Sequence, residues 1–250
     1  MSTSSIIERL IASIRRDAPV RRVQISPFWT AVLARRCGLA STSLSGGHRH
    51  DRALVREAGR LTELTGIELA RLATSASPLE AAVGVAAINA LLDVDEAGMV
   101  ELNARDLLLE RGRGKRVALV GHFPFIPALR EAAGDLTVLE LDPRPRELLA
   151  DEAERVIPEA DVVAITGSSF VNGTVDRLLR ICQKDSFVIL LGPSTPLSPI
   201  LFEYGVAVLS GTIVCDPETA MRCVAEGATF RQIRGVKTVS LFREGSKLKR

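Results

Sequence analysis

Aromatic side chains are scarce in this chain of 250 residues, which contains one Trp, one Tyr and eight Phe. Proteins that bind single-stranded nucleic acid stack the bases on aromatic side chains, so a base-stacking surface is not expected. The formal net charge of +2 at pH 7 gives no basic surface of the kind that attracts nucleic acid or anionic membranes. We therefore expect no nucleic-acid partner.

Long apolar runs are also missing. No stretch reaches the roughly 18 to 20 consecutive apolar residues of a membrane helix, so no membrane insertion is expected. Residues 4–17 place apolar residues at helical spacing with arginines on the other face, which predicts an amphipathic helix and not a signal peptide. The four Cys residues are widely spaced, without a CxxC pair, and favour reduced thiols. These features favour a cytoplasmic protein.

The first part of the chain has a mixed α and β pattern. Strands are expected at residues 21–25 and 29–34, and helices at residues 61–74 and 78–93. The last of these helices begins with Pro, which is favoured in a first helical turn. It is apolar nearly all round, so we expect it to be buried. We predict a smaller α+β domain over residues 1–112.

From residue 113 onward, short apolar strands alternate with helices. Unbroken apolar strands in this arrangement indicate a parallel sheet that is covered on both faces. Because crossovers are right-handed, residues 113–250 are expected to form a Rossmann-like, doubly wound α/β domain, with the first domain packed over the carboxyl edge of its sheet. Helices are expected between the strands, including one at residues 147–156. The strands are expected near residues 117–121, 137–141, 161–166, 186–191, 206–212 and 238–242.

Four loops should meet at the carboxyl edge of this sheet, where open α/β sheets bind ligands. They are residues 121–127, 142–146, 166–174 and 192–199. Their Gly, Ser, Thr and Asn residues allow close backbone approach or supply hydroxyl groups, and the helices that follow add partial positive charge. The same residue types also form turns and helix caps, so for one such loop alone an ordinary turn is favoured. Together the four loops predict a site for a small anionic molecule.

Several well-known catalytic motifs are absent. The first loop, GHFPFIP, is not GxGxxG, so the usual pyrophosphate turn is missing. Asp142 ends the second strand, 21 residues after Gly121, near the position of a ribose-binding acid, but spacing alone does not establish a dinucleotide site. No Ser lies in a GxSxG elbow, and no carboxylate pair stands out for glycoside hydrolysis.

His and Cys residues are the remaining candidates for chemistry. His122 directly follows the first strand of the sheet, where it could serve as metal ligand, acid or base, or bond only to its own loop. Cys215, after the fifth strand, could face the same crevice as a soft metal ligand or be a buried thiol. His48 and His50 precede Asp51; they would share a face on a strand, but we favour a polar turn.

Several strings resemble those of one prokaryotic family. VALVGHFPFI, ADVVAITGSSFVNGT, GPSTPLSPILFEYGVAVLSGTIV and the amino-terminal PLEAAVGVAAINALL carry the resemblance, which spans nearly the whole chain. The carboxy-terminal part of that family is described as a heavy-metal chelation domain. The resemblance implies an amino-terminal domain similar to the enolase amino-terminal domain, then a Rossmann-like domain, with a site in the cleft between them. Asn89, an amide in an apolar helix, either bonds within the core or points into that cleft.

The loop positions and the resemblance together define the predicted site. His122 and Cys215 are the predicted metal ligands. The ligand-binding residues are predicted to be Asn89, Gly121, His122, Phe123, Pro124, Asp142, Thr166, Gly167, Ser168, Asn172, Gly173, Thr174, Gly192, Pro193, Ser194 and Thr195.

Hydroxyl, amide and backbone groups suit an anion better than a bare soft cation, which prefers three or four His, Cys or carboxylate ligands. A metal ion carried inside an oxygen-rich chelate would reconcile this donor set with chelation. The leading hypothesis is therefore a protein that binds a metal chelate or a small anion in an interdomain cleft. The alternatives are an enzyme, such as a transferase, that uses a nucleotide-like cofactor with His122 as acid or base, and an assembly protein with the sheet as scaffold. The sequence leaves open whether the chain forms a homo-oligomer.

Overall fold

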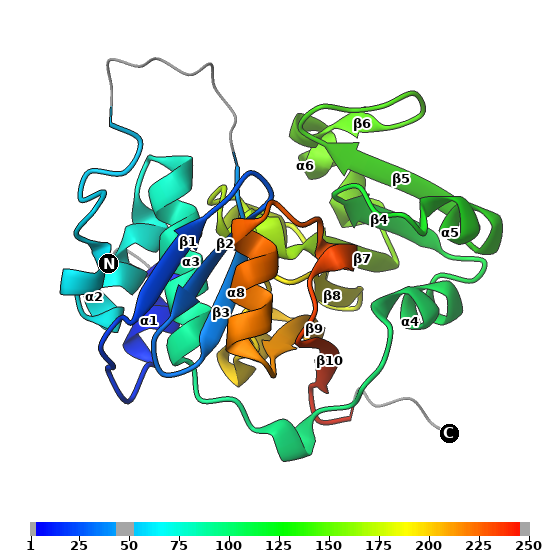
Figure 1. Ribbon diagram of the computed structural model, residues 1–250. Coiled ribbons are helices and arrows are strands. Elements are labelled where there is room, and N and C mark those ends of the chain that lie inside the picture. Colours follow the sequence, from blue (N-terminus) through cyan, green and yellow to red (C-terminus); the bar gives the residue numbers. More distant parts are fainter. Residues whose placement is uncertain (1–3, 44–52, 246–250) are drawn as a thin grey trace.

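The computed structural model describes residues 4–43 and 53–245, and this part of the chain contains two β-sheets (Figure 1). A three-stranded antiparallel sheet comes first, with strands β1 (Arg22–Ile25), β2 (Trp29–Leu33) and β3 (Cys37–Ser41). A seven-stranded sheet follows. Among the described helices, none has the length and apolar character needed to cross a membrane.

The helix α3 (Pro78–Leu91) packs on the three-stranded sheet and is buried on nearly all sides, as predicted. It is enclosed by α2 (Gly66–Ala70) and the short 3-10 helix η2 (Arg71–Thr74), while η1 (Leu61–Glu63) and α1 (Ile6–Ala12) complete this part. Because the helix is covered by protein on its different faces, its apolar residues need not form a single stripe.

Two glycines allow the backbones around α3 to approach closely. A Cβ atom at Gly38 of β3 would lie 2.1 Å from the carbonyl oxygen of Ala86, and one at Gly84 would lie 1.9 Å from the backbone nitrogen of Ala73. Strand β3 was not predicted, since a Gly in the middle of a short segment weakens the strand pattern. The tertiary contact with α3 explains why Gly stands there.

The strands of the larger sheet are β4 (Arg116–Val120), β5 (Asp135–Glu140), β6 (Leu148–Leu149), β7 (Val162–Thr166), β8 (Phe187–Leu191), β9 (Val206–Val214) and β10 (Val236–Phe242). Their order is β10-β9-β8-β7-β4-β5-β6, and all neighbouring pairs are parallel except β9 and β10. The winding reverses between β4 and β7. The predicted Rossmann-like sheet is confirmed, and the first four predicted strands, which are β4, β5, β7 and β8, are parallel.

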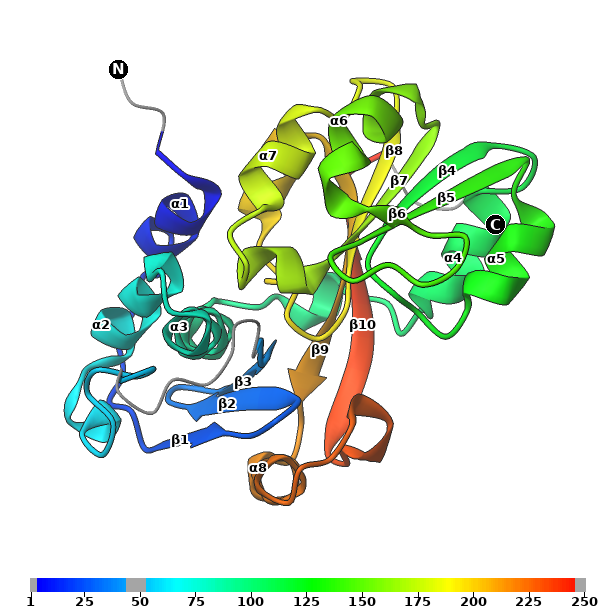
Figure 2. The ribbon, with the colours of Figure 1, turned by 90° about the horizontal axis from the view of Figure 1, so that it is seen from above.

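Helices cover both faces of this sheet, as Figure 2 shows. On one face α4 (Ala104–Arg111) and α5 (Ile126–Ala132) pack on Val117 and Leu119 of β4. On the other face, Ala118 belongs to the cluster that contains α6 (Ala153–Val156) and α7 (Val175–Arg180). Successive residues of a strand face opposite sides, so a strand buried on both faces is apolar throughout. The short 3-10 helices are η3 (Glu96–Gly98), η4 (Ala150–Glu152), η5 (Ile157–Glu159), η6 (Gly167–Phe170), η7 (Pro199–Tyr204) and η8 (Phe230–Gln232).

Three further details differ from the sequence prediction. The single helix expected at residues 61–74 is divided into η1, α2 and η2, because Thr65 caps a new helix start at Gly66. Residues 147–156 were expected to be one helix, but Leu148 and Leu149 form the edge strand β6 and the helical turns begin only at Ala150. The last strand, β10, is antiparallel to β9. Helix α8 (Pro217–Ala225) packs on β1 and β2 instead of crossing back over the large sheet, so the chain re-enters beside β9 in the opposite direction.

The amino-terminal part contacts the carboxyl edge of the large sheet. The backbone N–H of Ser41, at the end of β3, donates to Oγ of Ser194 in the loop after β8 at 2.8 Å. One cluster of buried side chains continues from Ile6 and Leu10 of α1 to Leu201 of η7. The predicted loop after β8 therefore lies where the two sheets come together.

Candidate functional site

A cavity of about 500 Å³ lies beyond the carboxyl ends of β4 and β8, and we call it the edge pocket. Small-molecule sites commonly have volumes of about 300 to 1,000 Å³, so it has the right size for one. Its walls come from the segment before α4, the loops after β4 and β8, the ribbon of β9 and β10, and η8. The lining residues are Glu101, Leu102, Asn103, Ala104, Phe123, Phe125, Leu191, Gly192, Pro193, Ser210, Gly211, Thr212, Phe230 and Thr238.

One wall of the edge pocket is aromatic. The rings of Phe123 and Phe125 are stacked, with centroids 5.2 Å apart and an interplanar angle of 22°. Phe230 lines the pocket from η8, and its ring centroid lies 5.6 Å from that of Trp29 on β2. In a chain with few aromatic residues, the stacked pair of Phe123 and Phe125 supplies a flat apolar surface for a ligand.

Another wall of the edge pocket carries hydroxyl groups from β9 and β10. Thr212 and Thr238 are direct cross-strand partners, and so are Ser210 and Ser240. Residues two apart on a strand share a face, so the four side chains form what we call the hydroxyl face. Ser210, Thr212 and Thr238 line the edge pocket, while Oγ of Ser240 donates to the carbonyl oxygen of Leu102 at 3.3 Å.

The hydroxyl face and the phenylalanines Phe125 and Phe230 were missed by the sequence prediction. A signal was available, because hydroxyl residues alternate in both strands, as SGT at residues 210–212 and TVS at residues 238–240. Their convergence could not be read from the sequence, since it depends on the antiparallel register of β9 and β10.

The loops after β4, β7 and β8 pack against one another through glycines. Gly121 has φ 108°, and a Cβ atom there would lie 2.8 Å from Cβ of Thr166. A Cβ atom at Gly167 would lie 2.6 Å from both the backbone nitrogen and Oγ1 of Thr195. Gly192, which lines the edge pocket, has φ 110°. These glycines let three of the predicted loops lie side by side.

Asn89 joins the amino-terminal part to these loops. Its Nδ2 donates to the carbonyl oxygens of Leu39 at 2.9 Å and of Ser194 at 3.2 Å. Its Oδ1 is buried without a hydrogen-bond partner among the described residues, and so are Oγ1 of Thr195 and Oγ of Ser169. Each buried oxygen without a hydrogen bond lowers the stability of the fold by about 1 to 3 kcal/mol. In native proteins such oxygens usually bond to water or to a ligand.

The loop after β7 divides into two halves with different surroundings. Thr166 and Ser168 bond to each other through their hydroxyl oxygens at 3.0 Å, close to Gly121. In the second half, Oδ1 of Asn172 accepts from N and Oγ1 of Thr174 at 3.2 and 2.7 Å, and Gly173 has φ 73°. These last three residues form a turn before α7.

The turn does not reach the edge pocket. Asn172 and Gly173 line another cavity, of about 390 Å³, together with Ser5, Ile7 and the segment before α3. The structure therefore does not bring Asn172, Gly173 and Thr174 together with the loops after β4 and β8, and their role in binding stays a prediction.

His122 lies in a cluster with residues of the loop after β5. Its Nδ1 is 2.8 Å from Oε1 of Glu147, and its Nε2 is 2.6 Å from Nη1 of Arg144. The backbone N–H of Arg144 donates to Oε2 of Glu147 at 2.9 Å, and this bond, followed by the contact with His122, lowers the pKa of Glu147. Asp142 and Pro124 are exposed nearby on the same two loops.

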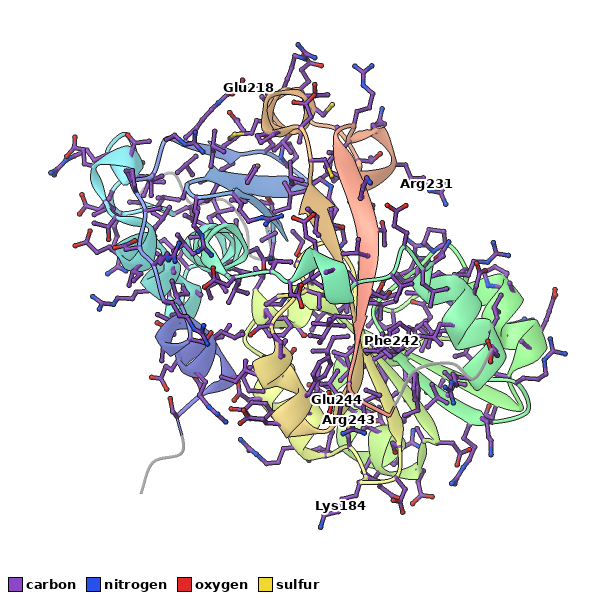
Figure 3. All side chains as sticks on the ribbon, turned by 90° about the horizontal axis from the view of Figure 1, so that it is seen from below. Lys184, Glu218, Arg231, Phe242, Arg243 and Glu244 are labelled. Carbon is purple, nitrogen blue, oxygen red and sulfur yellow. The ribbon has the colours of Figure 1, made fainter. Side chains whose placement is uncertain are left out.

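The two predicted metal ligands are placed far apart. Strand β9 pairs with β8 only as far as Ser210, and Cys215 lies five residues further on, roughly 16 Å beyond that edge. Figure 3 shows the ribbon of β9 and β10, which runs from Phe242 in the large sheet toward Glu218 and Arg231 beyond the sheet. His122 instead follows β4, which β7 separates from β8.

The donor set of the described residues does not suit a bare metal ion. Within residues 4–43 and 53–245, no three or more His, Cys, Asp and Glu side chains are arranged to hold one. Soft transition metals usually take three or four such ligands. His48, His50 and Asp51 lie outside the described residues.

Two family models match the chain, and both are described as "Putative heavy-metal chelation". The DUF4213 model matches residues 7–92, and the DUF364 model matches residues 103–241. An uncharacterized protein of Methanocaldococcus jannaschii, MJ0500, is 31% identical over 164 residues, which is 62% of this chain and 62% of that protein. The chain thus spans less than two thirds of that relative's length.

Two solved structures are similar over nearly the whole chain. A DUF364 family protein of unknown function from Desulfitobacterium hafniense has a TM-score of 0.83 at 27% identity, covering 95% of this chain and 98% of that one. A DUF364 family protein of unknown function from Pyrococcus horikoshii has a TM-score of 0.79 at 20% identity, with the same coverage of 95% and 98%. The second similarity concerns the fold alone.

Proposed function

This chain belongs to the DUF364 family, and on that premise we propose that it binds a small oxygen-rich molecule, free or as a metal chelate, in the edge pocket. The observation that carries the proposal is the composition of the two walls. A flat ligand can lie against the stacked rings of Phe123 and Phe125 while its oxygen atoms bond to the hydroxyl face.

In this proposal the metal ion is coordinated by the bound chelator and not by side chains of the protein. Thr212 and Thr238 are neutral and can both donate and accept hydrogen bonds, which matches the outer oxygen atoms of a chelate. The family description and the lack of a soft metal site in the described part of the chain are then compatible.

The proposed site lies between two domains, residues 1–112 and residues 113–250. In support, one wall of the edge pocket is the segment Glu101–Ala104, which leads into α4, and Phe230 in another wall contacts Trp29 of the first sheet. A ligand bound there would touch both parts of the chain.

Catalysis with His122 as acid or base has less support. Its Nε2 contacts Arg144 and its Nδ1 contacts Glu147, so both ring nitrogens are engaged. The side chain also lies outside the lining of the edge pocket. Binding therefore stands as the function that the geometry supports best.

The first experiment asks what purified protein carries. Metal analysis of the intact protein is combined with mass spectrometry of the supernatant after acid denaturation. We expect an oxygen-rich small molecule in stoichiometric amount. Metal in stoichiometric amount without any organic molecule would contradict the proposal.

The second experiment measures Kd by equilibrium dialysis for Ni²⁺ alone, for citrate alone and for the Ni²⁺–citrate complex. The double variant Thr212→Val and Thr238→Val removes two hydroxyl groups while keeping branched side chains on the ribbon. Each lost hydrogen bond is worth about 1 kcal/mol, so Kd for citrate or its complex should rise at least about tenfold.

Thr137→Val is the matched control, because Thr137 lies on β5 of the same sheet and outside the edge pocket. Its Kd should match that of the unmodified protein. Equal affinities in the double variant and the control would refute the proposal, and so would tighter binding of Ni²⁺ alone than of the complex.

A further inference from the structure

We propose that Arg144, held in place by His122 and Glu147, forms an oxyanion-binding site at the carboxyl ends of β4 and β5, separate from the edge pocket. The ligand would be a small molecule with a carboxylate or phosphate group. We call these three residues the anion site.

The contact between Arg144 and His122 defines the state of the imidazole ring. A guanidinium group stays protonated and has only donors, so Nε2 of His122 must accept the hydrogen bond from Nη1 at 2.6 Å. The other ring nitrogen, Nδ1, then carries the hydrogen and donates it to Oε1 of Glu147 at 2.8 Å. The two contacts thus assign one tautomer to the ring, which the spectra described below test.

Glu147 anchors this arrangement from below the surface. Its side chain is only 5% exposed, and both carboxylate oxygens are used, Oε1 by His122 and Oε2 by the backbone N–H of Arg144. The same carboxylate thus orients the ring and closes the turn that presents Arg144. The side chain of Arg144, which is held by His122, therefore loses little conformational entropy when a ligand binds.

The backbone of this loop is strained. Arg146 has φ 72°, and it is the one non-glycine residue at positive φ in the part of the chain that the structure describes. The left-handed conformation costs a residue with a side chain about 1 to 2 kcal/mol. Strain of this kind gathers at ligand sites, where the surrounding structure enforces it.

Two arginines of this loop have no acidic side chain within ion-pair distance in the described part of the chain. Arg144 and Arg146 are both exposed, and neither takes part in an ion pair within 4.0 Å among the described side chains. Of the acidic side chains nearby, Glu140 accepts from the backbone N–H of Leu141 and Glu147 is fully bonded, while Asp142 is exposed and forms no ion pair with Arg144 within 4.0 Å. Among the described residues, the Arg144 side chain donates only through Nη1, to His122, which leaves most of its five N–H donors for a ligand in the planar fork that matches carboxylate and phosphate groups.

The location agrees with ligand binding. β4 borders the point where the winding of the sheet reverses, and crevices at that point are the usual ligand sites of doubly wound sheets. His122 and Phe123 are adjacent in sequence, yet Phe123 lines the edge pocket and His122 faces the loop after β5. One loop thus separates an apolar pocket from a cationic group.

The test is isothermal titration calorimetry of the full chain at low ionic strength, with inorganic phosphate in one arm and acetate in the other. We expect saturable binding of at least one ion, and the arm that saturates identifies the group. Arg144→Gln should weaken Kd at least tenfold. Arg180→Gln, at an exposed arginine of α7, is the matched control and should change Kd less than twofold.

Variants of His122 test its positioning role. His122→Ala should weaken binding, because the guanidinium loses its acceptor, and His122→Gln should restore much of the affinity, because the amide oxygen can accept from Arg144. Long-range ¹H–¹⁵N spectra should show the Nδ1–H tautomer for the signal that disappears in His122→Ala. The variant Thr212→Val with Thr238→Val should bind the ion normally, which separates this site from the edge pocket.

Three results would overturn the inference. They are no saturable binding of either ion, equal affinity of Arg144→Gln and Arg180→Gln, and an Nε2–H tautomer at His122.

Discussion

Replacing Glu80 by Gln should destabilise the fold by about 3 kcal/mol at neutral pH. Glu80 lies in the first turn of α3, with a side chain that is 3% exposed. Its Oε1 accepts from the backbone N–H and Nε of Arg56 at 2.9 and 3.0 Å. Its Oε2 accepts from Nη2 of Arg56 at 2.9 Å and from Oγ of Ser75 at 2.5 Å. The carboxylate thus ties two segments to the start of α3.

The magnitude follows from the pKa of this carboxyl group. The hydrogen bond from the Arg56 side chain, helped by those from Ser75 and the Arg56 backbone, lowers the pKa of Glu80 from 4.5 to about 2. That difference corresponds to roughly 3 kcal/mol of stability. Because the pKa is lower in the folded state, this stability is fully present above pH 4.5 and is lost as the pH falls toward 2. About 1 kcal/mol remains near pH 3.

The assay is urea unfolding, followed by circular dichroism, of the unmodified protein and Glu80→Gln between pH 7 and pH 3. An amide in place of Oε2 cannot accept from Arg56 or Ser75, so the variant loses those bonds. The difference in unfolding free energy should shrink from about 3 to about 1 kcal/mol over this range.

Glu63→Gln is the matched control. Glu63 also pairs with an arginine, at 2.9 Å from Nε of Arg60, but its side chain is 60% exposed. Exposed pairs contribute little, so the control should stay within about 1 kcal/mol of the unmodified protein at neutral pH. A loss below about 1 kcal/mol for Glu80→Gln at pH 7, or a loss independent of pH, would refute the reasoning.

The remaining predictions concern the loops at the carboxyl edge, and urea unfolding measures each of them. Gly167→Ala should cost about 1 to 3 kcal/mol, because its Cβ would lie 2.6 Å from backbone and side-chain atoms of Thr195. Gly173 has φ 73°, and a Cβ atom there would have no other atom within 4 Å. Gly173→Ala should therefore cost only the backbone strain, about 1 kcal/mol of unfolding free energy, and a larger loss than for Gly167→Ala would contradict this. Ser194→Ala should cost about 1 to 3 kcal/mol, since the Ser41 N–H loses its acceptor, and an unchanged unfolding midpoint would speak against that contact.

Much of the fold could be predicted because its signals are local. Strands such as VVAIT at residues 162–166 are apolar on both faces, which requires cover on both sides, and the structure places helices there. The same reasoning predicted the buried helix α3. Strand β3 was not predicted because Gly38 weakens its strand pattern. The Gly is required by the close contact with α3, which is distant in sequence.

The candidate site was predicted in part for the same reason. The loops after β4, β7 and β8 follow strands that could be located, and parallel strands bring their ends to one edge. The cluster of His122, Arg144 and Glu147 was not predicted beyond His122, since it forms between two separate loops.

By itself, the sequence determined the doubly wound sheet, the edge where its loops meet and the burial of α3, because hydrophobic periodicity acts over a few residues. Only the tertiary structure decided that β10 runs antiparallel to β9, that Thr212 faces Thr238, and that Cys215 lies far from His122. These features depend on strand register and on where α8 packs. Register is a relation between segments distant in sequence, and no local pattern contains it.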